Sequence, residues 1–410
     1  MTTYNSVSNG SKREQIYKCG WLWKTGYYAN TKRKEERGMR EGWEYKKLGE
    51  VASSELGKTL NKSKDTGKLY PYICAVNVLW DMIDFTILKH AFFEKEEIDR
   101  YSVRKGDLLV CEGGDTGRSA IWEKEEPVLY QNALHRVRFT TEMEARFAMY
   151  CLWHLKNNGQ IDKKYSKGVT IKHLVKSSLL SIELPVPPLS TQLSIVSELD
   201  KINELIRLKK EQLKDYDNLA QSIFYEMFGD PVVNEKGWEV KRITDLCIEI
   251  SAGGDASKHE IKKTKDEIFS VPVYSNGIDE DGLYGYSNHA TINQPAITLA
   301  ARGTIGAAFI RTEPYIPIIR LVSVIPDLSK ISLTYLFYIL KQTEWDRTGG
   351  TIPQLPVPKV KQLTLPLPPL PLQQAFAQRI KLIEQQKAEI QNTIADLETL
   401  LASRMQYWFD

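Results

Sequence analysis

The sequence lacks long apolar runs, paired cysteines and an apolar leader. Its longest apolar stretches, such as 296–301, are far too short to span a bilayer. Residues 1–15 are polar and lack the apolar core of a signal peptide. The five cysteines are odd in number, widely scattered and form no Cys-x-x-Cys pair, and the six histidines show no metal-ligand spacing. We therefore expect a cytoplasmic protein with reduced thiols and no metal site.

Signatures of catalysis are absent as well. A DNA methyltransferase needs an Asn/Asp-Pro-Pro-Tyr/Phe tetrapeptide, whereas both Pro-Pro pairs here, at 187–188 and 368–369, precede leucine. The Gly-x-x-x-x-Gly-Lys-Ser/Thr phosphate loop that ATP-driven translocation requires is missing too. Asp255 with Glu260 and Lys262 resembles the carboxylate set of a Mg²⁺-dependent nuclease, but the spacing is short and favours a charged loop. The pattern predicts that the chain is not an enzyme.

The overall charge is small, because 55 basic residues nearly balance 52 acidic residues and leave a net charge of +3. Such a balance does not require a nucleic-acid partner, although local basic patches can still provide one. With 410 residues the chain exceeds the size of one hydrophobic core, and a hydrophobic content of 42% fits a globular protein. We therefore expect two or three domains.

The sequence repeats itself at a fixed offset of 181 residues. Each copy contains a Gly-x-Thr-Ile motif, then Leu-Pro-x-Pro-Pro-Leu, then a glutamine three residues later. Ordered matches of this kind indicate a tandem duplication. The matched segments are Gly168-Val169-Thr170-Ile171 with Gly349-Gly350-Thr351-Ile352, 184–189 with 365–370, and Gln192 with Gln373.

Upstream of these motifs the similarity is weaker and the offset drifts, as insertions in loops would cause. The stretch 42–44 resembles 237–239 at an offset of 195, and 114–117 resembles 303–306 at an offset of 189. Each copy therefore consists of a variable module followed by a closely matched segment.

Each closely matched segment leads into a long run with apolar residues spaced alternately by four and three. A repeat of 3.5 residues over this length is typical of a coiled-coil helix. We call the apolar stripe along each helix its seam. The seam predicted for the first helix contains Ile195, Leu199, Ile202, Ile206, Leu213, Tyr216, Ala220, Ile223 and Met227, and it is interrupted by the charged residue Lys209. The seam predicted for the second contains Phe376, Ile380, Ile383, Ile390, Ile394, Leu397, Leu401 and Trp408, with breaks at Lys387 and Arg404.

The expected ends of these helices carry suitable residues. Ser190 or Thr191 can cap the first helix, and Pro371 suits the first position of the second. Gly229 and Pro231 are expected to stop the first helix. At 1.5 Å per residue, each helix should be roughly 55 Å long.

The connection between the helices constrains their direction. Only 230–237 separate the first helix from the second module, so the second helix is expected to return antiparallel to the first. Two antiparallel copies are related by an approximate two-fold axis and form a rod with one module at each end. The alternative is a pair of unrelated core helices in a larger bundle, but the matched length and register of the two seams favour a mutual pair.

Each module is expected to mix helices and strands, with many loops. The predicted fold class is α+β, with two α/β domains joined by two long antiparallel coiled-coil helices in a pseudo-two-fold arrangement. The expected strands, separated by glycine turns, are 107–111, 119–122, 296–300 and 307–311, and the expected short helices are 146–155 and 333–342.

Basic and polar residues cluster in the predicted loops of both modules. Lys and Arg contact phosphates, and Arg, Asn, Gln and Ser can read base edges in the major groove. For any single residue a solvated surface is the simpler interpretation, so only the arrangement as a whole favours DNA. The candidates are Lys58, Lys62, Lys64, Arg118, His135 and Arg136 in the first module and Lys258, Ser275, Asn276, Arg302 and Thr304 in the second, with Lys68, Arg138, Lys262, Lys263 and Lys265 nearby.

The doubled pattern of Gly-x-Thr-Ile, Leu-Pro-x-Pro-Pro-Leu-x-x-Gln and a long helix resembles the specificity subunits of type I restriction–modification systems. The stretch 104–110 with the glycine turn 112–117 is also similar to the target-recognition domains of that family. The resemblance covers roughly residues 42–410. The divisions that follow are an N-terminal extension 1–41, target-recognition domains 42–184 and 231–365, and helical segments 185–230 and 366–410.

The resemblance implies a function. Each target-recognition domain would read one half of a split site in double-stranded DNA, and the helices would fix the number of unread bases between the halves. The helices would also bind two modification (methyltransferase) subunits, which restriction (nuclease and translocase) subunits join. S-adenosylmethionine, ATP and Mg²⁺ would then belong to these partners, with no cofactor in this chain and no membrane contact.

Two other functions stay open at this point. The first is a structural coiled-coil adaptor whose end modules bind proteins. The second is an independent nuclease. Salt-sensitive binding to one bipartite DNA sequence would exclude the adaptor, and Mg²⁺-dependent cleavage by the isolated chain would reveal the nuclease.

Overall fold

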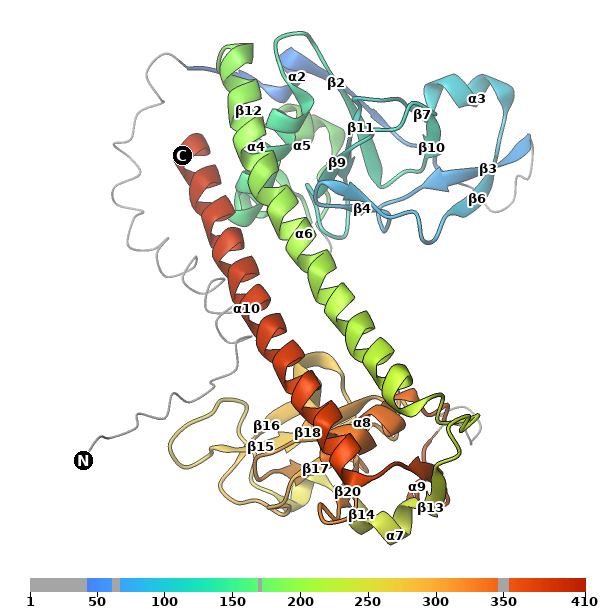
Figure 1. The fold of residues 1–410 in the computed structure, drawn as a ribbon. Coiled ribbons are helices and arrows are strands. Elements are labelled where there is room, and N and C mark those ends of the chain that lie inside the picture. The colour runs from blue at the N-terminus through green and yellow to red at the C-terminus, as the bar shows by residue number, and fades with distance from the viewer. Residues whose placement is uncertain (1–42, 61–66, 169–171, 346–353) are drawn as a thin grey trace. The chain divides into compact units, whose positions relative to one another are not determined.

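The computed structural model describes residues 43–60, 67–168, 172–345 and 354–410 (Figure 1). These residues form two compact units. The first unit comprises the described residues up to Lys209 together with Thr393–Asp410, and the second unit is Lys210–Asn392. Each unit therefore contains one module and one portion of both long helices.

The first unit contains a small antiparallel ribbon, two four-stranded sheets and a short hairpin. The ribbon pairs β1 (Glu44–Lys47) with β12 (Glu183–Val186). The first sheet has the order β2 (Ala52–Leu56), β11 (Leu134–Phe139), β8 (Leu108–Cys111), β9 (Ser119–Ile121). The second has the order β6 (Lys89–Phe93), β3 (Lys68–Ile73), β10 (Val128–Tyr130), β7 (Ser102–Val103), and the hairpin joins β4 (Val78–Leu79) to β5 (Met82–Ile83).

The helices of the first unit cover these sheets. The continuous apolar run of β8 is buried along its whole length because β11 and β9 flank it and α4 covers it. The helices and helical turns are α2 (Leu48–Val51), α3 (Lys95–Arg100), α4 (Ala145–Asn157), the π-helical turn Ile161–Tyr165 and α5 (Lys176–Leu180).

The second unit repeats this plan, as the duplication predicts. Its ribbon pairs β13 (Glu239–Arg242) with β21 (Thr364–Leu367). Its four-stranded sheet has the order β14 (Cys247–Ala252), β20 (Val322–Pro326), β17 (Ala296–Leu299), β18 (Ala308–Arg311). A three-stranded sheet has the order β16 (Leu283–Ser287), β15 (Val271–Tyr274), β19 (Ile316–Pro317), and the helices are α7 (Ile243–Leu246), α8 (Leu333–Gln342) and α9 (Val357–Lys361).

The two long helices are α6 (Leu189–Phe228) and α10 (Leu370–Phe409), each of 40 residues. Gly229 follows α6 with φ +76°, the left-handed conformation that ends many helices. The expectation that Ser190 or Thr191 caps α6 was wrong by one or two residues, because the helix already begins at Leu189. Both side chains therefore lie in its first turn.

Most of the predicted seam is buried, but it shifts near the C-terminal end of each helix. The second unit buries the predicted Ala220, but beyond it buries Phe224 and Phe228 instead of Ile223 and Met227. The last turns of α10 likewise bury Met405 instead of Arg404. A straight helix has 3.6 residues per turn, so a stripe spaced by 3.5 drifts around it. The predicted positions Ile195, Leu199, Ile202, Phe376, Ile380, Ile383 and Ile394 are buried, whereas Leu213, Ile223 and Leu397 are half-buried.

Aromatic contacts attach a short helix to the end of a long helix in each unit. In the first unit the ring centroids of Phe147, on α4, and Phe409, on α10, lie 5.5 Å apart. In the second unit Tyr335, on α8, and Phe228, on α6, are 4.8 Å apart. Both pairs meet edge to face, a favourable aromatic geometry. The repeat in sequence is therefore a repeat in packing.

The structure confirms the predicted α+β class with long helices, and each predicted strand and short helix corresponds to an observed one. Within each unit the portions of α6 and α10 run antiparallel (Figure 1). No helix in the described ranges combines the length and apolarity needed to cross a bilayer.

Candidate nucleic-acid interface

A glycine turn links two neighbouring strands at the same place in each unit. In the first unit it joins β8 to β9, with φ +74° at Gly114 and +85° at Gly117. In the second unit it joins β17 to β18, with φ +68° at Gly303 and +86° at Gly306. The matching dihedral angles show that the weak similarity between 114–117 and 303–306 reflects one shared turn.

Close packing also requires the second glycine of each turn. A Cβ atom on Gly117 would lie 3.0 Å from Cγ2 of Ile161, and one on Gly306 would lie 2.5 Å from Cδ1 of Trp345. A side chain at either position would therefore push the turn away from the element beneath it. Each glycine turn is therefore packed closely against Ile161 or Trp345 of its own unit.

The chain that follows each Gly-x-Thr-Ile motif is bound to the glycine turn. Leu174 N–H donates to the Glu112 carbonyl at 2.7 Å, and Leu355 N–H donates to the Ala301 carbonyl at 2.9 Å. The motif residues 169–171 and 349–352 lie outside the described residues. In both units, therefore, the residue three positions after the motif binds the same turn.

A second turn recurs before β11 and β20. In the first unit Asn132 N–H donates to the Lys58 carbonyl at 2.9 Å, and Ala133 follows with φ +87°. In the second unit Ile319 N–H donates to the Gly254 carbonyl at 2.8 Å, and Arg320 follows with φ +63°. Residues 131–133 and 318–320 are therefore equivalent, and we call each one the crossing turn.

A glycine allows the chain to pass close to each crossing turn. A Cβ atom on Gly57 would lie 2.4 Å from the Gln131 carbonyl oxygen, and one on Gly253 would lie 2.4 Å from that of Pro317. Only glycine permits backbone to approach backbone so closely. The crossing turn of each unit is thus fixed against the strand that precedes it.

A third loop meets the glycine turn in both units. In the first unit Arg118 donates from Nη2 to the Ala75 carbonyl at 2.9 Å. In the second unit the side-chain oxygen of Asn276 accepts from Ala301 N–H at 2.7 Å, and the Asn276 carbonyl accepts from the Thr304 hydroxyl at 2.8 Å. The loops after β3 and β15 are therefore bound to the glycine turns.

The structure brings four of the five predicted residues of the second module together. Ser275 and Asn276 form the loop after β15, whereas Arg302 and Thr304 belong to the glycine turn bound to it. Arg302 is half-buried and donates to Oε1 of Gln354 at 3.4 Å, and Thr304 is exposed. Lys258 is exposed at the end of the 3-10 turn Ala256–Lys258.

The predicted lysines and arginine of the first module are less available. Lys58 pairs with Glu97 and donates to the Phe92 carbonyl at 2.9 Å. Arg118 is partly buried and is engaged by Ala75. Lys62 and Lys64 lie outside the described residues.

His135 and Arg136 were expected in a loop, but both belong to a strand. Both lie on β11 in the interior, where His135 has no exposed surface and its Nε2 lies 2.8 Å from the Leu174 carbonyl. Burial lowers the pKa of His135, so the ring is neutral near pH 7. Arg136 donates from Nη1 to the carbonyls of Arg100 and Ser102 at 2.8 and 2.7 Å. Neither side chain is available to a DNA surface in this conformation.

Several charged residues around the first glycine turn were not predicted. Lys156 forms ion pairs with Asp115 at 2.9 Å and with Asp162 at 3.0 Å. Although burial acts in the opposite direction, hydrogen bonds from Lys156 and Thr116 lower the pKa of Asp162. Lys156 is thus occupied in bracing the turn. No sequence signal distinguishes it, because Asp115 is distant in the chain and the spacing of six residues to Asp162 is not one that brings side chains together on a regular helix.

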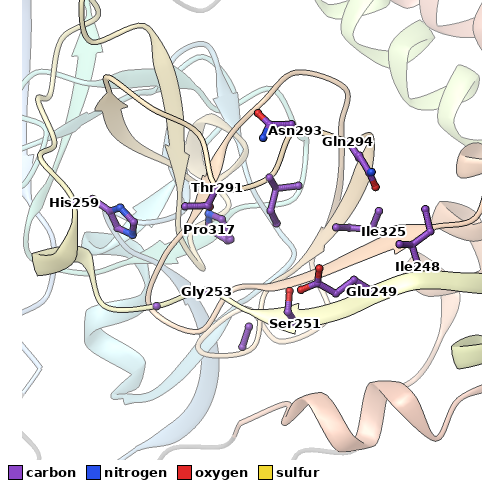
Figure 2. Close-up of a pocket in the computed structure, with 13 residues that line it drawn as sticks. Ile248, Glu249, Ser251, Gly253, His259, Thr291, Asn293, Gln294, Pro317 and Ile325 are labelled. Carbon is purple, nitrogen blue, oxygen red and sulfur yellow. The ribbon is translucent and has the colours of Figure 1, made fainter.

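The second unit also contains an open polar cavity of about 540 Å³ (Figure 2). Gly253 and Pro317 line it, so it borders the crossing turn. Its other polar side chains are Glu249, Ser251, His259, Thr291, Asn293 and Gln294. None of the predicted DNA-binding residues lines it. Among the described residues, no three His, Cys, Asp or Glu side chains are grouped so that they could hold a metal ion.

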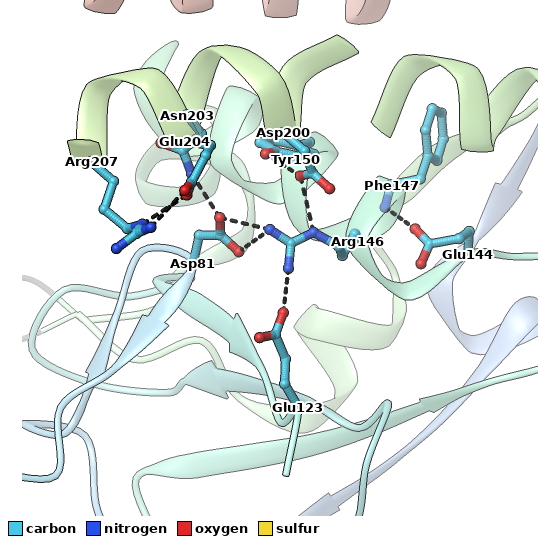
Figure 3. A network of polar contacts seen from close by, with 10 residues as sticks. All are labelled: Asp81, Glu123, Glu144, Arg146, Phe147, Tyr150, Asp200, Asn203, Glu204 and Arg207. Carbon is cyan, nitrogen blue, oxygen red and sulfur yellow. Dashed lines mark hydrogen bonds and ion pairs between the residues drawn. The ribbon is translucent and has the colours of Figure 1, made fainter. Parts of the chain in front are cut away.

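A polar network connects the first module to α6 (Figure 3). Arg146, on α4, forms ion pairs with Asp81 at 2.8 Å and with Asp200, on α6, at 3.0 Å. Asn203, also on α6, donates to Asp81 at 2.7 Å, and the Tyr150 hydroxyl donates to Asp200 at 2.7 Å. Burial, together with the Asp200 charge, raises the pKa of Asp81 to about 6 despite the nearby guanidinium. The network fixes α4 and the Asp81 hairpin on the long helix.

Comparison with known proteins agrees with this duplicated architecture. A family model described as the type I restriction modification DNA specificity domain matches residues 40–215 and 235–399. A putative type I specificity subunit of Mycoplasma pneumoniae is 32% identical over 209 residues, which cover 50% of this chain and 56% of that protein. The type I restriction enzyme MjaIX specificity subunit of Methanocaldococcus jannaschii is 24% identical over 373 residues, covering 82% and 85%. The aligned part thus spans little more than half of the Mycoplasma relative.

Two solved structures have a similar fold. The S subunit of a type I restriction-modification system from M. genitalium aligns with a TM-score of 0.51 and 15% identity, covering 92% of this chain and 98% of that chain. A chain from a structural study of complex assembly in the type I R-M system aligns with a TM-score of 0.55 and 17% identity, covering 90% and 98%. Since the family model matches most of the sequence, in two successive copies, the chain belongs to the type I restriction–modification DNA specificity family.

Proposed function

We propose that this chain is the DNA-sequence-recognition subunit of a type I restriction–modification complex, and that each unit reads one half of a bipartite site. One observation carries the proposal. The same three loops, namely the loop after β3 or β15, the glycine turn and the crossing turn, are built twice on a chain of this family. Two copies of one framework suit two half-sites of one target.

The side chains on the two frameworks differ, which supports different half-sites. The first glycine turn presents the partly exposed Asp115 and Arg118, whereas the second presents the partly exposed Arg302 and the exposed Thr304. Hydrogen-bonding groups presented by loops can read base edges, and lysines around them can contact phosphates. Backbone contacts shared by both units would keep the register of these groups constant while their identities vary.

The long helices would serve the rest of the complex. Leu205 and Leu208 are exposed and three residues apart on α6, so they are neighbours on one face of that helix, which supports a contact with a protein partner there. We propose that these helices dock two modification subunits, to which restriction subunits bind. Catalysis, with S-adenosylmethionine, ATP and Mg²⁺, would belong to those partners, and this chain would supply recognition in the cytoplasm without catalysing a reaction itself.

The decisive experiment is genome-wide mapping of adenine methylation in cells that express this chain with a matching modification subunit. We expect one new bipartite motif that is absent when the chain is omitted. A stable complex of the two proteins that produces no motif would favour the coiled-coil adaptor and contradict the proposal. Cells that express only the modification subunit provide the control.

A domain exchange tests whether the halves are read independently. Replacing 43–182 with the corresponding domain of another family member should change one half of the motif and leave the other half intact. A change in both halves would contradict independent reading by the two units.

A further inference from the structure

The crossing turn of the second unit holds two bulky residues in a conformation that they rarely adopt. Ile319 and Arg320 have φ values of +54° and +63°. Left-handed backbone is unfavourable for residues with a Cβ atom and especially for β-branched isoleucine, and such outliers cluster at functional sites. Both residues are exposed, with 40% of the Ile319 surface accessible. Core packing therefore does not account for the strained pair.

Hydrogen bonds hold this strained turn on two sides. Ile319 N–H and Arg320 N–H donate to the carbonyls of Gly254 and Gly253 at 2.8 and 3.1 Å. From the loop after β15, the side-chain amide of Asn276 donates to the Ile319 carbonyl at 2.6 Å. The same side chain accepts from Ala301 next to the glycine turn. Asn276 thus ties all three loops together and fixes the position from which the Arg320 side chain extends.

The Arg320 side chain is available to a ligand. Within the described part of the chain its guanidinium forms no hydrogen bond or ion pair. By contrast, Arg311 in the same unit donates to Thr298 at 3.0 Å and is buried. A guanidinium presents two parallel N–H groups that match O6 and N7 of guanine in the major groove. A fixed backbone lowers the entropy cost of placing those groups.

The first unit shows that a crossing turn forms without an arginine at its last position. Its crossing turn has Ala133 at the position of Arg320, also with positive φ. A methyl group is therefore sufficient to build the turn, and the long cationic side chain of the second unit is an addition to the shared framework. The two crossing turns share the hydrogen bond made by the preceding residue, from Asn132 N–H to the Lys58 carbonyl and from Ile319 N–H to the Gly254 carbonyl, while the residue that follows differs.

We propose that Arg320 is a base-contacting, specificity-determining residue of the second unit, and that Asn276 is the positioning residue that holds it. The inference rests on the proposed function and identifies which side chain reads DNA in one half-site. The chemistry of the guanidinium commits the contact to a guanine edge in duplex DNA. Asn276 acts through the turn, since its side-chain amide and oxygen are both engaged internally.

The test compares methylation motifs and DNA affinity for the full chain in complex with its modification subunit. Arg320→Ala reproduces the residue found in the first unit and should therefore fold. We expect it to relax discrimination at one or two base pairs of one half-site by about 10- to 100-fold, with the other half-site unchanged. Arg320→Lys retains the charge but loses the two-pronged geometry, so it should keep most affinity and still lose discrimination. Arg242→Ala, an exposed arginine on β13, is the matched control and should change neither half.

Other outcomes would overturn the inference. An unchanged motif and affinity for Arg320→Ala would show that this side chain does not contact DNA. A uniform loss of affinity on all sequences, with a smaller salt dependence, would identify a phosphate contact instead of base reading. If the wild-type chain yields no bipartite motif, the proposed function fails first, so the two failures are distinguishable.

Discussion

Gln192 and Gln373 make equivalent hydrogen bonds in the two units. The Nε2 atom of Gln192 donates to the Pro187 carbonyl at 2.8 Å, and that of Gln373 donates to the Pro368 carbonyl at 2.7 Å. The side-chain oxygens accept from backbone N–H groups of Glu144 and Ser332, both at 2.8 Å. Each glutamine thus links the first turn of a long helix to the start of a short helix. This role explains why the glutamine recurs after both Pro-Pro-Leu segments.

Removing one of these glutamines should destabilise the unit that contains it. Gln373 is completely buried, so Gln373→Leu would leave the Pro368 carbonyl and the Ser332 N–H without partners. We expect a loss of about 2 kcal/mol in the free energy of unfolding, measured by urea denaturation followed by circular dichroism. Gln374→Leu, one residue along on the exposed side of the helix, should have little effect. Equal losses from both variants would show that helix composition, not the buried hydrogen bonds, is responsible.

Two adjacent glycines should respond to alanine in opposite directions. A Cβ atom on Gly253 would meet the Pro317 carbonyl oxygen at 2.4 Å, so Gly253→Ala must displace the crossing turn. We expect it to cost about 2–3 kcal/mol. Gly254 has no atom within 4 Å of such a Cβ, and its φ is not positive, so Gly254→Ala should stabilise the protein by roughly 0.5 kcal/mol. Urea denaturation of both variants measures this contrast.

The Gly253 variant also has a functional readout. In methylation mapping, the displaced turn should impair reading of one half-site more than the other, because the change lies in the second unit. A Gly253→Ala protein as stable as Gly254→Ala would contradict the proposed close approach.

Asp81 should make stability depend on pH in the mildly acidic range. Its pKa rises from 3.8 to about 6 on folding, mainly because it is buried. The native state therefore keeps a proton that the unfolded state releases, and the contribution of Asp81 to stability falls as pH rises from about 4 to about 6. The full change is at most about 3 kcal/mol, since each pKa unit corresponds to 1.36 kcal/mol.

Substitution isolates this effect. Asp81→Asn should remove the falling component of the stability profile measured by urea denaturation between pH 4 and pH 7.5. Glu123→Gln changes a carboxylate that is bound to the same arginine but largely exposed, so it should leave the profile almost unchanged. A wild-type profile that rises through this window relative to Asp81→Asn would mean that Arg146 lowers the pKa of Asp81 and that the sign is reversed.

The regular elements could be predicted because their signals are local. Hydrophobic periodicity predicts α6 and α10, and β8 was predicted from its apolar residues between glycines. Near the end of α6 the predicted seam residue, Ile223, is one position away from the buried Phe224, because a repeat of 3.5 residues drifts around a helix with 3.6 residues per turn. Hydrophobic periodicity thus predicts the presence of a helix or strand well, but it predicts less well which residues of that element are buried.

The candidate site could be predicted only in part, since tertiary contacts decide which polar residues remain available. His135 and Arg136 lie in a segment rich in basic residues, which predicts exposure. They are nevertheless buried, because β11 pairs with a strand on each side. Arg320 was missed because it stands alone in an apolar stretch that resembles a strand. Its left-handed turn depends on the close approach of Gly253, which is distant in sequence. The cluster of Asn276, Arg302 and Thr304 was predicted by residue type, but its internal bonds were not.

The break that Arg404 makes in the predicted seam is compensated by an ion pair. Arg404, on α10, donates from Nη2 to Oε2 of Glu198, on α6, at 3.2 Å, and the Trp408 indole N–H donates to the same oxygen at 3.1 Å. The hydrogen bond from Arg404 lowers the pKa of Glu198. The pair aligns position 404 of α10 with position 198 of α6. It therefore favours a single antiparallel register of the two helices within the first unit.

A double-mutant cycle of Arg404→Leu and Glu198→Gln should measure this coupling. About a third of each side chain is exposed, so solvent screening limits the expected coupling to about 0.5–1 kcal/mol at pH 7 and low salt. A carboxylate with a lowered folded pKa stabilises the protein above its unfolded value of 4.5, and this contribution is lost as pH falls through the folded pKa. The coupling should therefore vanish in acid and shrink in high salt. Arg379→Leu, an exposed arginine on the same helix, should show no coupling to Glu198→Gln, and a coupling that persists in acid would show that the contact is apolar and not ionic.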